Sequence, residues 1–219
     1  MKKYFTLITF LLILPGIYAQ EENDQEENRN EFKTLFGDRH ISHGGYGAVS
    51  VNYSQIDSKD AILIGGRGAW VIGHGIALGF SGTGFLNDFH YSDAMHSHVN
   101  LAGGYGGLLV EPILFPRFPV HISVPVVAGV GGVAYSSSFN PYDLEDPHYF
   151  VEDATSFLVL EPGVELEFNI VRFFRLSIGG YYRITSDVRF SDSRILQQPP
   201  PATVLEGFSG GITLKFGKF

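Results

Sequence analysis

Residues 62–72 read Ile-Leu-Ile-Gly-Gly-Arg-Gly-Ala-Trp-Val-Ile, and the spacing of large and small side chains in this stretch decides the fold. Even positions carry large apolar side chains, namely Ile62, Ile64, Trp70 and Ile72. Odd positions include small or charged side chains, namely Gly65, Arg67 and Ala69. Because successive side chains of a β-strand point to opposite faces, this period of two predicts a strand with one apolar face.

The same alternation recurs along the chain and predicts an all-β protein. It continues in residues 76–83 and again near the end, in residues 207–216. We expect eight strands, at about 40–54, 60–72, 75–86, 97–110, 119–135, 155–169, 172–185 and 203–217. Glycine pairs such as Gly103-Gly104 and Gly179-Gly180 recur near the middle of these strands. Mid-strand glycine weakens an open sheet, but in a closed eight-stranded barrel it makes room for larger inward side chains.

The connections between the predicted strands alternate in length. Short turns are expected at His74, at Pro112–Phe118 and at Ile170-Val171, whereas longer polar loops are expected at 87–96, 136–154 and 186–202. Only the first connection, near Asp57–Lys59, departs from this alternation. Short turns at one end and long loops at the other are typical of outer-membrane barrels. The pattern predicts an antiparallel up-and-down transmembrane β-barrel with both termini at the short-turn, periplasmic end.

Charged residues in the middle of strands favour a membrane barrel over a soluble one. They share the face of the small residues: Arg67, Glu161, Glu165, Glu167, Arg175, Arg183 and Lys215. An Arg or Lys on the lipid face at mid-depth would cost about 2–4 kcal/mol, so this face is expected to line the lumen. Glu111, Arg172 and Glu206 are expected on the opposite face, near strand ends where that cost falls. The alternative is a soluble secreted barrel with a ligand pocket.

The region before the barrel divides into two further segments. Residues 1–19 have a basic start, an apolar stretch and a small residue at Ala19, which predicts a signal peptide cleaved near Ala19. Residues 20–37 are rich in acids and poor in apolar residues, which predicts a disordered periplasmic tail. The barrel is expected to occupy residues 38–219, and the predicted location is the outer membrane of a Gram-negative cell.

Composition excludes several functions. The 219 residues contain no cysteine and carry a formal charge of −8, so disulfides, thiol nucleophiles and Cys-type zinc sites are excluded. The negative charge without a basic run argues against nucleic-acid binding, which requires a positive footprint. No G-x-x-x-x-G-K phosphate loop is present, so nucleotide hydrolysis has no visible basis. We predict no cofactor and no resident metal.

Taken together, residues 40–219 resemble the small eight-stranded outer-membrane barrels, with a layout similar to the OmpA and OmpX transmembrane domains. The resemblance rests on the export signal, the eight amphipathic strands, the loop asymmetry and the aromatic C-terminus. It implies partners in outer-membrane lipids and in the outer-membrane assembly machinery, which reads a terminal aromatic residue such as Phe219. Phe219 lies an even number of residues from Lys215 but an odd number from Phe216, so the alternation places its side chain on the same face as Lys215. Either Phe216 is therefore the aromatic at the membrane edge, or a bulge intervenes.

The lumen charges have two interpretations. A plug of ion pairs would satisfy the buried charges, with Arg175 roughly opposite Glu165 or Glu167 across the short turn. A selectivity network for a narrow pore is the alternative. Because the interior of an eight-stranded barrel is normally filled, we favour the plug.

Two residues apart on one strand, His121 and Ser123 share a face and have the chemistry of a base and a nucleophile. Similar His-x-Ser spacing occurs in lipid A deacylases, which are also small outer-membrane barrels. No acid can be placed beside His121 from the sequence, and parity directs both side chains inward, away from an acyl chain. We therefore predict no catalytic residues and retain a lipid A-modifying enzyme as a minor alternative.

Loops and turns contain further candidates. Asp88, His90, Asp93, His96 and His98 include transition-metal ligand types but match no closed site. Asp143, Glu145, Asp146, Glu152 and Asp153 would suit Ca²⁺ but lack the spacing of a calcium loop. The apolar turn Pro112–Pro119 is expected to be an aromatic anchor at the membrane interface, with a docking site for a periplasmic partner as the alternative.

These observations predict a monomeric, non-enzymatic outer-membrane barrel with a plugged lumen. Its role would be structural or interactive, through extracellular loops whose ligand the sequence does not identify. The alternative is a narrow pore for small solutes.

Overall fold

The computed structural model describes residues 42–93, 95–140, 149–197 and 199–219. The predicted signal peptide and acidic tail lie outside these residues. The strands are β1 (His43–Ile56), β2 (Lys59–Ile72), β3 (Ile76–Asn87), β4 (His90–Ser92), β5 (Ser97–Leu114), β6 (Val120–Ser123), β7 (Val126–Ser138), β8 (Tyr149–Val171), β9 (Phe174–Thr185) and β10 (Gly207–Lys218). A 3-10 turn, η1, covers Ile195–Gln197. Among the described residues, no helix has the length and hydropathy to cross a membrane.

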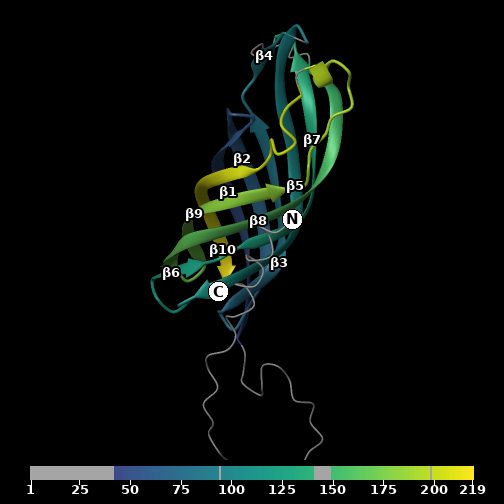
Figure 1. Ribbon diagram of the computed structural model, residues 1–219. Helices are drawn as coiled ribbons and strands as arrows, with labels where there is room; N and C mark the ends of the chain where they lie inside the picture. Colours follow the sequence, from purple (N-terminus) through teal and green to yellow (C-terminus); the bar gives the residue numbers. More distant parts are fainter. Residues whose placement is uncertain (1–41, 94, 141–148, 198) are drawn as a thin grey trace, which may run out of the picture. The chain divides into compact units, whose positions relative to one another are not determined.

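The strands close into a ring (Figure 1). Each neighbouring pair is antiparallel, in the order β1, β2, β3, β5, β7, β8, β9, β10, and β10 returns to pair with β1. β6 and β7 form one barrel strand, interrupted at Val124-Pro125, and β4 is a short hairpin partner of β5. The predicted eight-stranded antiparallel barrel is therefore confirmed.

Proline explains the interruption between β6 and β7. Pro125 has no N–H to donate to the ladder, so the regular pairing stops there. The wall remains joined across the break, because the Val124 N–H donates to the Pro112 carbonyl (2.9 Å) and the Gly163 N–H donates to the Pro125 carbonyl (2.8 Å).

Tight turns join β1 to β2 and β2 to β3. Asp57 and Ser58 have φ values of 56° and 57°, and Gly73 and His74 have φ values of 58° and 60°. Two consecutive left-handed residues match the type I′ turn, whose twist suits a β-hairpin. The connections after β5 and β8 are also short, at residues 115–119 and 172–173. The end with the turns 73–75, 115–119 and 172–173 is called the short-turn end below, and the opposite end the long-loop end.

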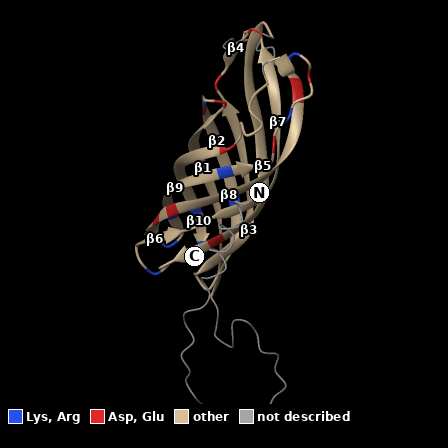
Figure 2. Cartoon of the chain, in the orientation of Figure 1, with Lys and Arg blue, Asp and Glu red and all other residues tan. Residues whose placement is uncertain are grey.

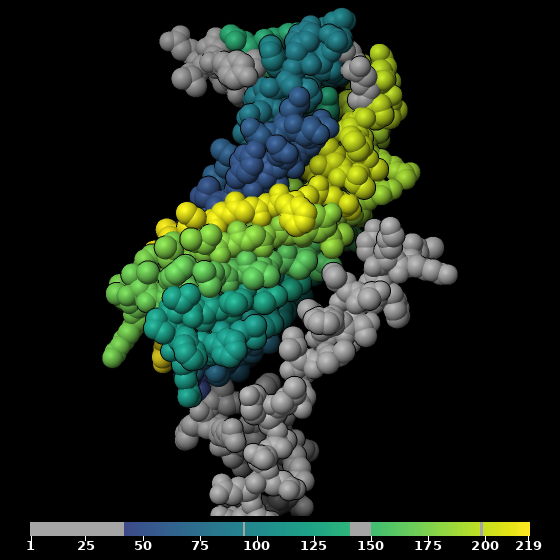
Figure 3. All heavy atoms as spheres, turned by 60° about the vertical axis from the view of Figure 1, so that its left-hand side comes forward, coloured from purple at the N-terminus to yellow at the C-terminus, as the bar shows by residue number. Residues whose placement is uncertain are grey.

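The outer face of the barrel wall is apolar. Its exposed side chains include Val49, Val51, Ile62, Ile64, Phe80, Leu108, Val130, Leu158, Ile178 and Ile212. In Figure 3, β8, β9 and β10 run obliquely across the molecule as continuous bands. The predicted separation of faces therefore holds around the barrel.

One predicted facing is wrong. Glu111 is expected outside, but it is fully buried in the lumen, in line with Leu109 and Ile113. The reason is that Leu108 and Leu109 are adjacent and equally apolar, so residue type does not separate the two faces of this part of β5. Arg172 is exposed in its turn and Glu206 is half-buried in the connection before β10.

Buried side chains divide the lumen into two layers. The layer nearer the short-turn end is charged and is bordered at that end by a small apolar cluster that includes Val71, Ala77 and Ile113. The layer at the long-loop end is an apolar cluster of wall residues that includes Leu63, Phe85 and Phe157. Residues of the β9–β10 connection pack onto this cluster: Val188, Phe190, Ile195, Val204 and Leu205. We call the described part of that connection, residues 186–197 and 199–206, the cap.

At the long-loop end, β5, β7 and β8 rise beyond their neighbours in the barrel wall (Figure 1). β9 ends at Thr185, which pairs with Val159, so residues 149–158 of β8 continue past it. They pair with the end of β7, which in turn pairs with the start of β5. β4 and residues 97–101 of β5, 133–138 of β7 and 149–157 of β8 form what we call the protruding sheet.

Candidate functional site

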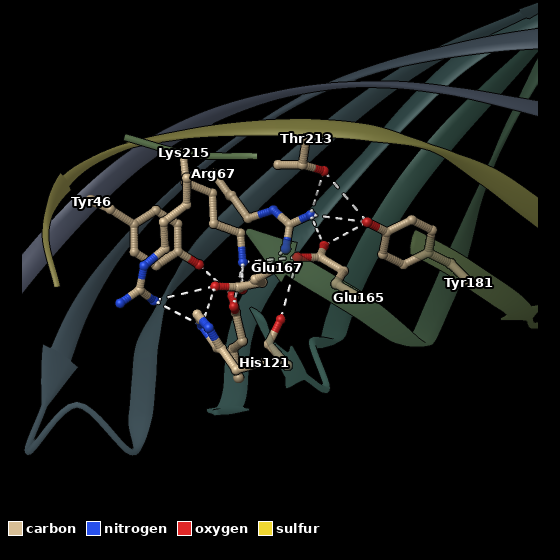
Figure 4. Close-up of polar contacts among 11 residues, drawn as sticks. Tyr46, Arg67, His121, Glu165, Glu167, Tyr181, Thr213 and Lys215 are labelled. Atoms are coloured by element: carbon tan, nitrogen blue, oxygen red, sulfur yellow. Dashed lines mark hydrogen bonds and ion pairs between the residues drawn. The ribbon is translucent and has the colours of Figure 1, made fainter. Parts of the chain in front are cut away.

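Lys215, on β10, lies at the centre of the charged layer (Figure 4). Its Nζ lies 2.5 Å from Glu111 Oε1 and 2.8 Å from Glu165 Oε2, and it also donates to Glu167. The Lys215 side chain is 1% exposed and the three carboxylates are fully buried. One ammonium thus compensates part of the charge of three carboxylates drawn from β5 and β8.

Arg67, on β2, contacts two of the same three carboxylates, Glu111 and Glu165. Its Nη2 donates to Glu165 Oε1 at 2.5 Å and to Thr213 Oγ1 at 3.2 Å, and its Nη1 lies 3.7 Å from Glu111 Oε2. The Tyr181 hydroxyl donates to Glu165 Oε1 at 2.5 Å. Glu165 therefore accepts from two residues at one oxygen, besides its pairing with Lys215 at the other.

Glu167 forms the part of the cluster nearest the short-turn end. His121 Nε2 lies 2.9 Å from Glu167 Oε2, and Arg175 Nη1 donates to the same oxygen at 3.2 Å. Arg175 is diagonal to Glu167 in the register, since it pairs directly with Asn169. It contacts Glu167, one of the two partners predicted from the turn.

Phe219 closes this layer toward the short-turn end. Its ring lies 3.9 Å from Arg175 Cζ and stacks on the Tyr46 ring at a centroid distance of 5.7 Å. The Tyr46 hydroxyl donates to Glu111. Phe216 remains outside, stacked on Phe174 at 4.9 Å, so it is the aromatic at the barrel edge and no bulge separates it from Lys218.

Arg183 and Glu161 form a separate group, nearer the apolar layer. Tyr105 donates to Glu161 Oε2 at 2.5 Å. Arg183 Nε donates to the Leu205 carbonyl of the cap at 2.5 Å, and its Cζ lies 5.8 Å from the centre of the Tyr105 ring. Of the seven predicted lumen residues, the structure therefore brings Arg67, Glu165, Glu167, Arg175 and Lys215 together and places Glu161 and Arg183 above them.

Sequence reasoning missed several members of the cluster. Glu111 was assigned to the wrong face, and four residues of the small-residue face were not identified as members: Tyr46, His121, Tyr181 and Thr213. Counting Glu111, the lumen holds four acids (Glu111, Glu161, Glu165, Glu167) and four bases (Arg67, Arg175, Arg183, Lys215). The charge balance could have indicated Glu111. Three buried acids leave one of the four buried cations without a counterpart, so a fourth inward acid was to be expected.

The geometry bears on two chemical alternatives, a metal site and a catalytic His-x-Ser pair. Glu111, Glu165 and Glu167 each offer an oxygen within 4.8 Å of the others, the only such grouping of His and acidic ligands in the described part of the chain. Lys215 Nζ already lies among these oxygens, where a metal cation would lie. Ser123 Oγ donates to Glu165 Oε2 at 3.4 Å, while His121 contacts Glu167. Each residue of the His-x-Ser pair is thus engaged with a carboxylate.

Acidic residues of the long-loop end tie the protruding sheet to the cap. The Asp153 carboxylate accepts the N–H groups of Ser191 and, at 2.9 Å, of Asp192. These backbone donors hold the pKa of Asp153 below its ordinary value. Glu152 Oε2 pairs with Arg194 Nη2 at 2.5 Å. Asp143, Glu145 and Asp146 lie outside the described residues.

In the turn 115–119, Phe115 and Phe118 are exposed and meet edge to face at 6.2 Å. The interface anchor and the docking site both stay predictions for this turn.

No protein-family model matches this chain, and no curated protein does. Among solved structures, the chain is similar to Neisserial surface protein A (NspA), with 10% identity over 83% of this chain and 100% of that one and a TM-score of 0.50. Ail of Yersinia pestis aligns over 80% of this chain and 97% of its own, with 11% identity and a TM-score of 0.43. The ring of eight strands and the likeness to NspA show that this chain has the fold of the small outer-membrane β-barrels.

Proposed function

We propose that this protein is a non-enzymatic barrel of a Gram-negative outer membrane that presents its long-loop end to the exterior. The protruding sheet carries this proposal. It extends the wall well past β9 and β10, and its exposed side chains include Tyr91, Phe150 and Val151. Such a surface suits interaction with another molecule.

The chemistry of that end favours a cationic ligand. Acidic residues outside the lumen gather there: Asp57, Asp60, Asp88, Asp93, Glu152, Asp153, Asp187, Asp192 and Glu206. The basic residues described at the same end are Lys59, Arg189 and Arg194. A surface of one dominant sign attracts partners of the other sign over roughly a Debye length.

Closure of the lumen supports anchoring in preference to conduction. The charged layer, sealed by Phe219, and the apolar layer, covered by the cap, block the interior at two levels. An eight-stranded barrel is just wide enough to be filled by its own side chains. The narrow pore is the alternative, and a lipid A-modifying enzyme has less support because His121 and Ser123 are buried inside.

The absence of cysteine from the whole sequence allows a direct test of location and orientation. Arg189→Cys places a thiol on the cap, where the native side chain is 80% exposed, and Arg117→Cys places one in the turn 115–119. A membrane-impermeant maleimide added to intact cells should label only the first variant. After permeabilisation of the outer membrane, both should react. Labelling of Arg117→Cys in intact cells, or of neither variant, would contradict the proposal.

A further inference from the structure

The two ends of the barrel differ in the charge that they present outside the lumen (Figure 2). At the short-turn end, the described Lys, Arg, Asp and Glu side chains outside the lumen are all basic: Arg117, Arg172 and Lys218. The corresponding acids of the described chain all lie at the long-loop end. An anionic partner is therefore expected at the short-turn end.

Two of these cations face one cavity. It has a volume of about 530 Å³ and is lined by Asn169, Val171, Arg172, Arg175, Lys218 and Phe219. The register explains why they meet, since Phe216 pairs with Phe174 and the Gly217 N–H donates to the Phe173 carbonyl at 2.9 Å. The last residues of β10 thus lie alongside the β8–β9 turn, with Arg172 on one side of the cavity and Lys218 on the other.

Arg175 contributes the inner wall of the cavity. Its side chain is 7% exposed and is held by Glu167 and by the ring of Phe219. Its Nε is buried and has no hydrogen-bond partner among the described residues. A guanidinium presents several donors in a planar fork that matches a phosphate group, and Lys and Arg side chains together attract anionic head groups.

The surface beside the cavity is apolar. Phe173 is 64% exposed and Phe216 is 48% exposed, and Phe216 stacks on Phe174 on the outer face of the wall. A ligand with an anionic head and hydrocarbon chains would contact both the cations and these rings, whereas a free phosphate would leave the rings unused.

We propose that this cavity binds the phosphate of an anionic phospholipid from the periplasmic leaflet. The phosphate lies between Arg172 and Lys218, with Arg175 behind it, and the acyl chains follow the outer wall past Phe173 and Phe216. The leaflet assignment rests on the orientation proposed above, which the maleimide labelling tests separately. The lipid contact itself is measured on the isolated protein.

Native mass spectrometry of the full chain, refolded in detergent, tests this site. The probes are phosphatidylglycerol and phosphatidylcholine with identical acyl chains. Arg172→Glu/Lys218→Glu should retain about tenfold less phosphatidylglycerol than the wild type, since each basic residue adds to the attraction of an anionic lipid. The control is Lys59→Glu/Arg189→Glu, which changes the net charge equally at the other end. It should retain as much lipid as the wild type.

Folding of each variant is checked by its faster migration on a denaturing gel before boiling. Equal loss of phosphatidylglycerol in both double variants, or equal retention of the two lipids by the wild type, would overturn the proposal. An excess of inorganic phosphate provides a third comparison. Failure of phosphate to displace the lipid supports a lipid site, whereas displacement would assign the cavity to a free oxyanion and overturn the lipid assignment.

Discussion

At the scale of single residues, Lys215 takes the position that a metal ion would have in an all-carboxylate site. It lies among Glu111, Glu165 and Glu167 and comes from a third strand of the wall, since Glu111 is on β5 and Glu165 and Glu167 share β8. A buried cation whose partners are fixed on other strands ties those strands together, and its loss leaves uncompensated charge in a medium that solvates charge poorly.

Lys215→Met should therefore destabilise the barrel by about 3–5 kcal/mol, the usual cost of breaking a buried ion pair. The measurement is the free energy of unfolding from urea titration in lipid vesicles. Lys218→Met removes the same charge from an exposed position three residues away and should change stability by less than about 0.5 kcal/mol. Equal effects of the two substitutions would show that net charge matters, and not the buried contacts.

At the scale of elements, the cap is held by two kinds of contact. Phe190 packs edge to face on Tyr135 at 5.7 Å, within the apolar layer. Around this contact, Asp153 accepts backbone N–H groups of the cap and Arg194 bridges Glu152 and Asp192. The apolar contacts do not titrate, whereas the carboxylate contacts do.

The attachment of the cap should consequently weaken in acid. Hydrogen bonds from Ser191 and Asp192 lower the pKa of Asp153, and those from Arg194 lower the pKa of Asp192. A carboxyl group whose pKa is lowered by folding stabilises the folded form above its ordinary pKa, and this contribution disappears as the pH falls through the lowered value. Amide exchange in residues 186–206, corrected for the intrinsic pH dependence, should be constant from neutral pH to about pH 5 and increase below about pH 4.

Asp153→Asn should accelerate the exchange of the cap at neutral pH and reduce its dependence on acid. Asp187→Asn is the matched control, because that carboxylate pairs with Arg189 where both side chains are well exposed, at 59% and 80%. Exchange that is equally fast in both variants would mean that the apolar contacts alone hold the cap.

At the scale of the whole molecule, closure at two separate levels predicts the result of a conductance measurement. In planar bilayers the wild-type protein should give no steady channel. Replacing residues 187–203 by a short turn should also give none, because the charged layer below the cap is closed independently. Steady current through the wild type would favour the pore, and current only after removal of the cap would mean that the charged layer does not close the lumen.

The sequence predicts the facing of side chains only where neighbouring residues differ clearly in size or polarity. The alternation around Ile64 and Arg67 predicts both the strand and its facing, because one side would be costly in lipid. At Leu108 and Leu109 the alternation disappears, and the facing of Glu111 is lost with it. The cap is unpredictable for another reason. Val188, Phe190 and Leu205 belong to no extended alternating run, and their burial depends on a barrel mouth that exists only after folding.

The ion pairs of the lumen have a consequence for the order of assembly. Lys215 and Glu111 are separated by 104 residues, and Arg67 and Glu165 by 98. Contacts between such distant parts of a chain form late and make folding slow. Because Arg67 on β2 and Glu165 on β8 come from opposite sides of the ring, these two charges remain unpaired until the seam between β1 and β10 closes it. An open intermediate would keep them solvated, so water must leave the interior at the final joining of the ends and not earlier.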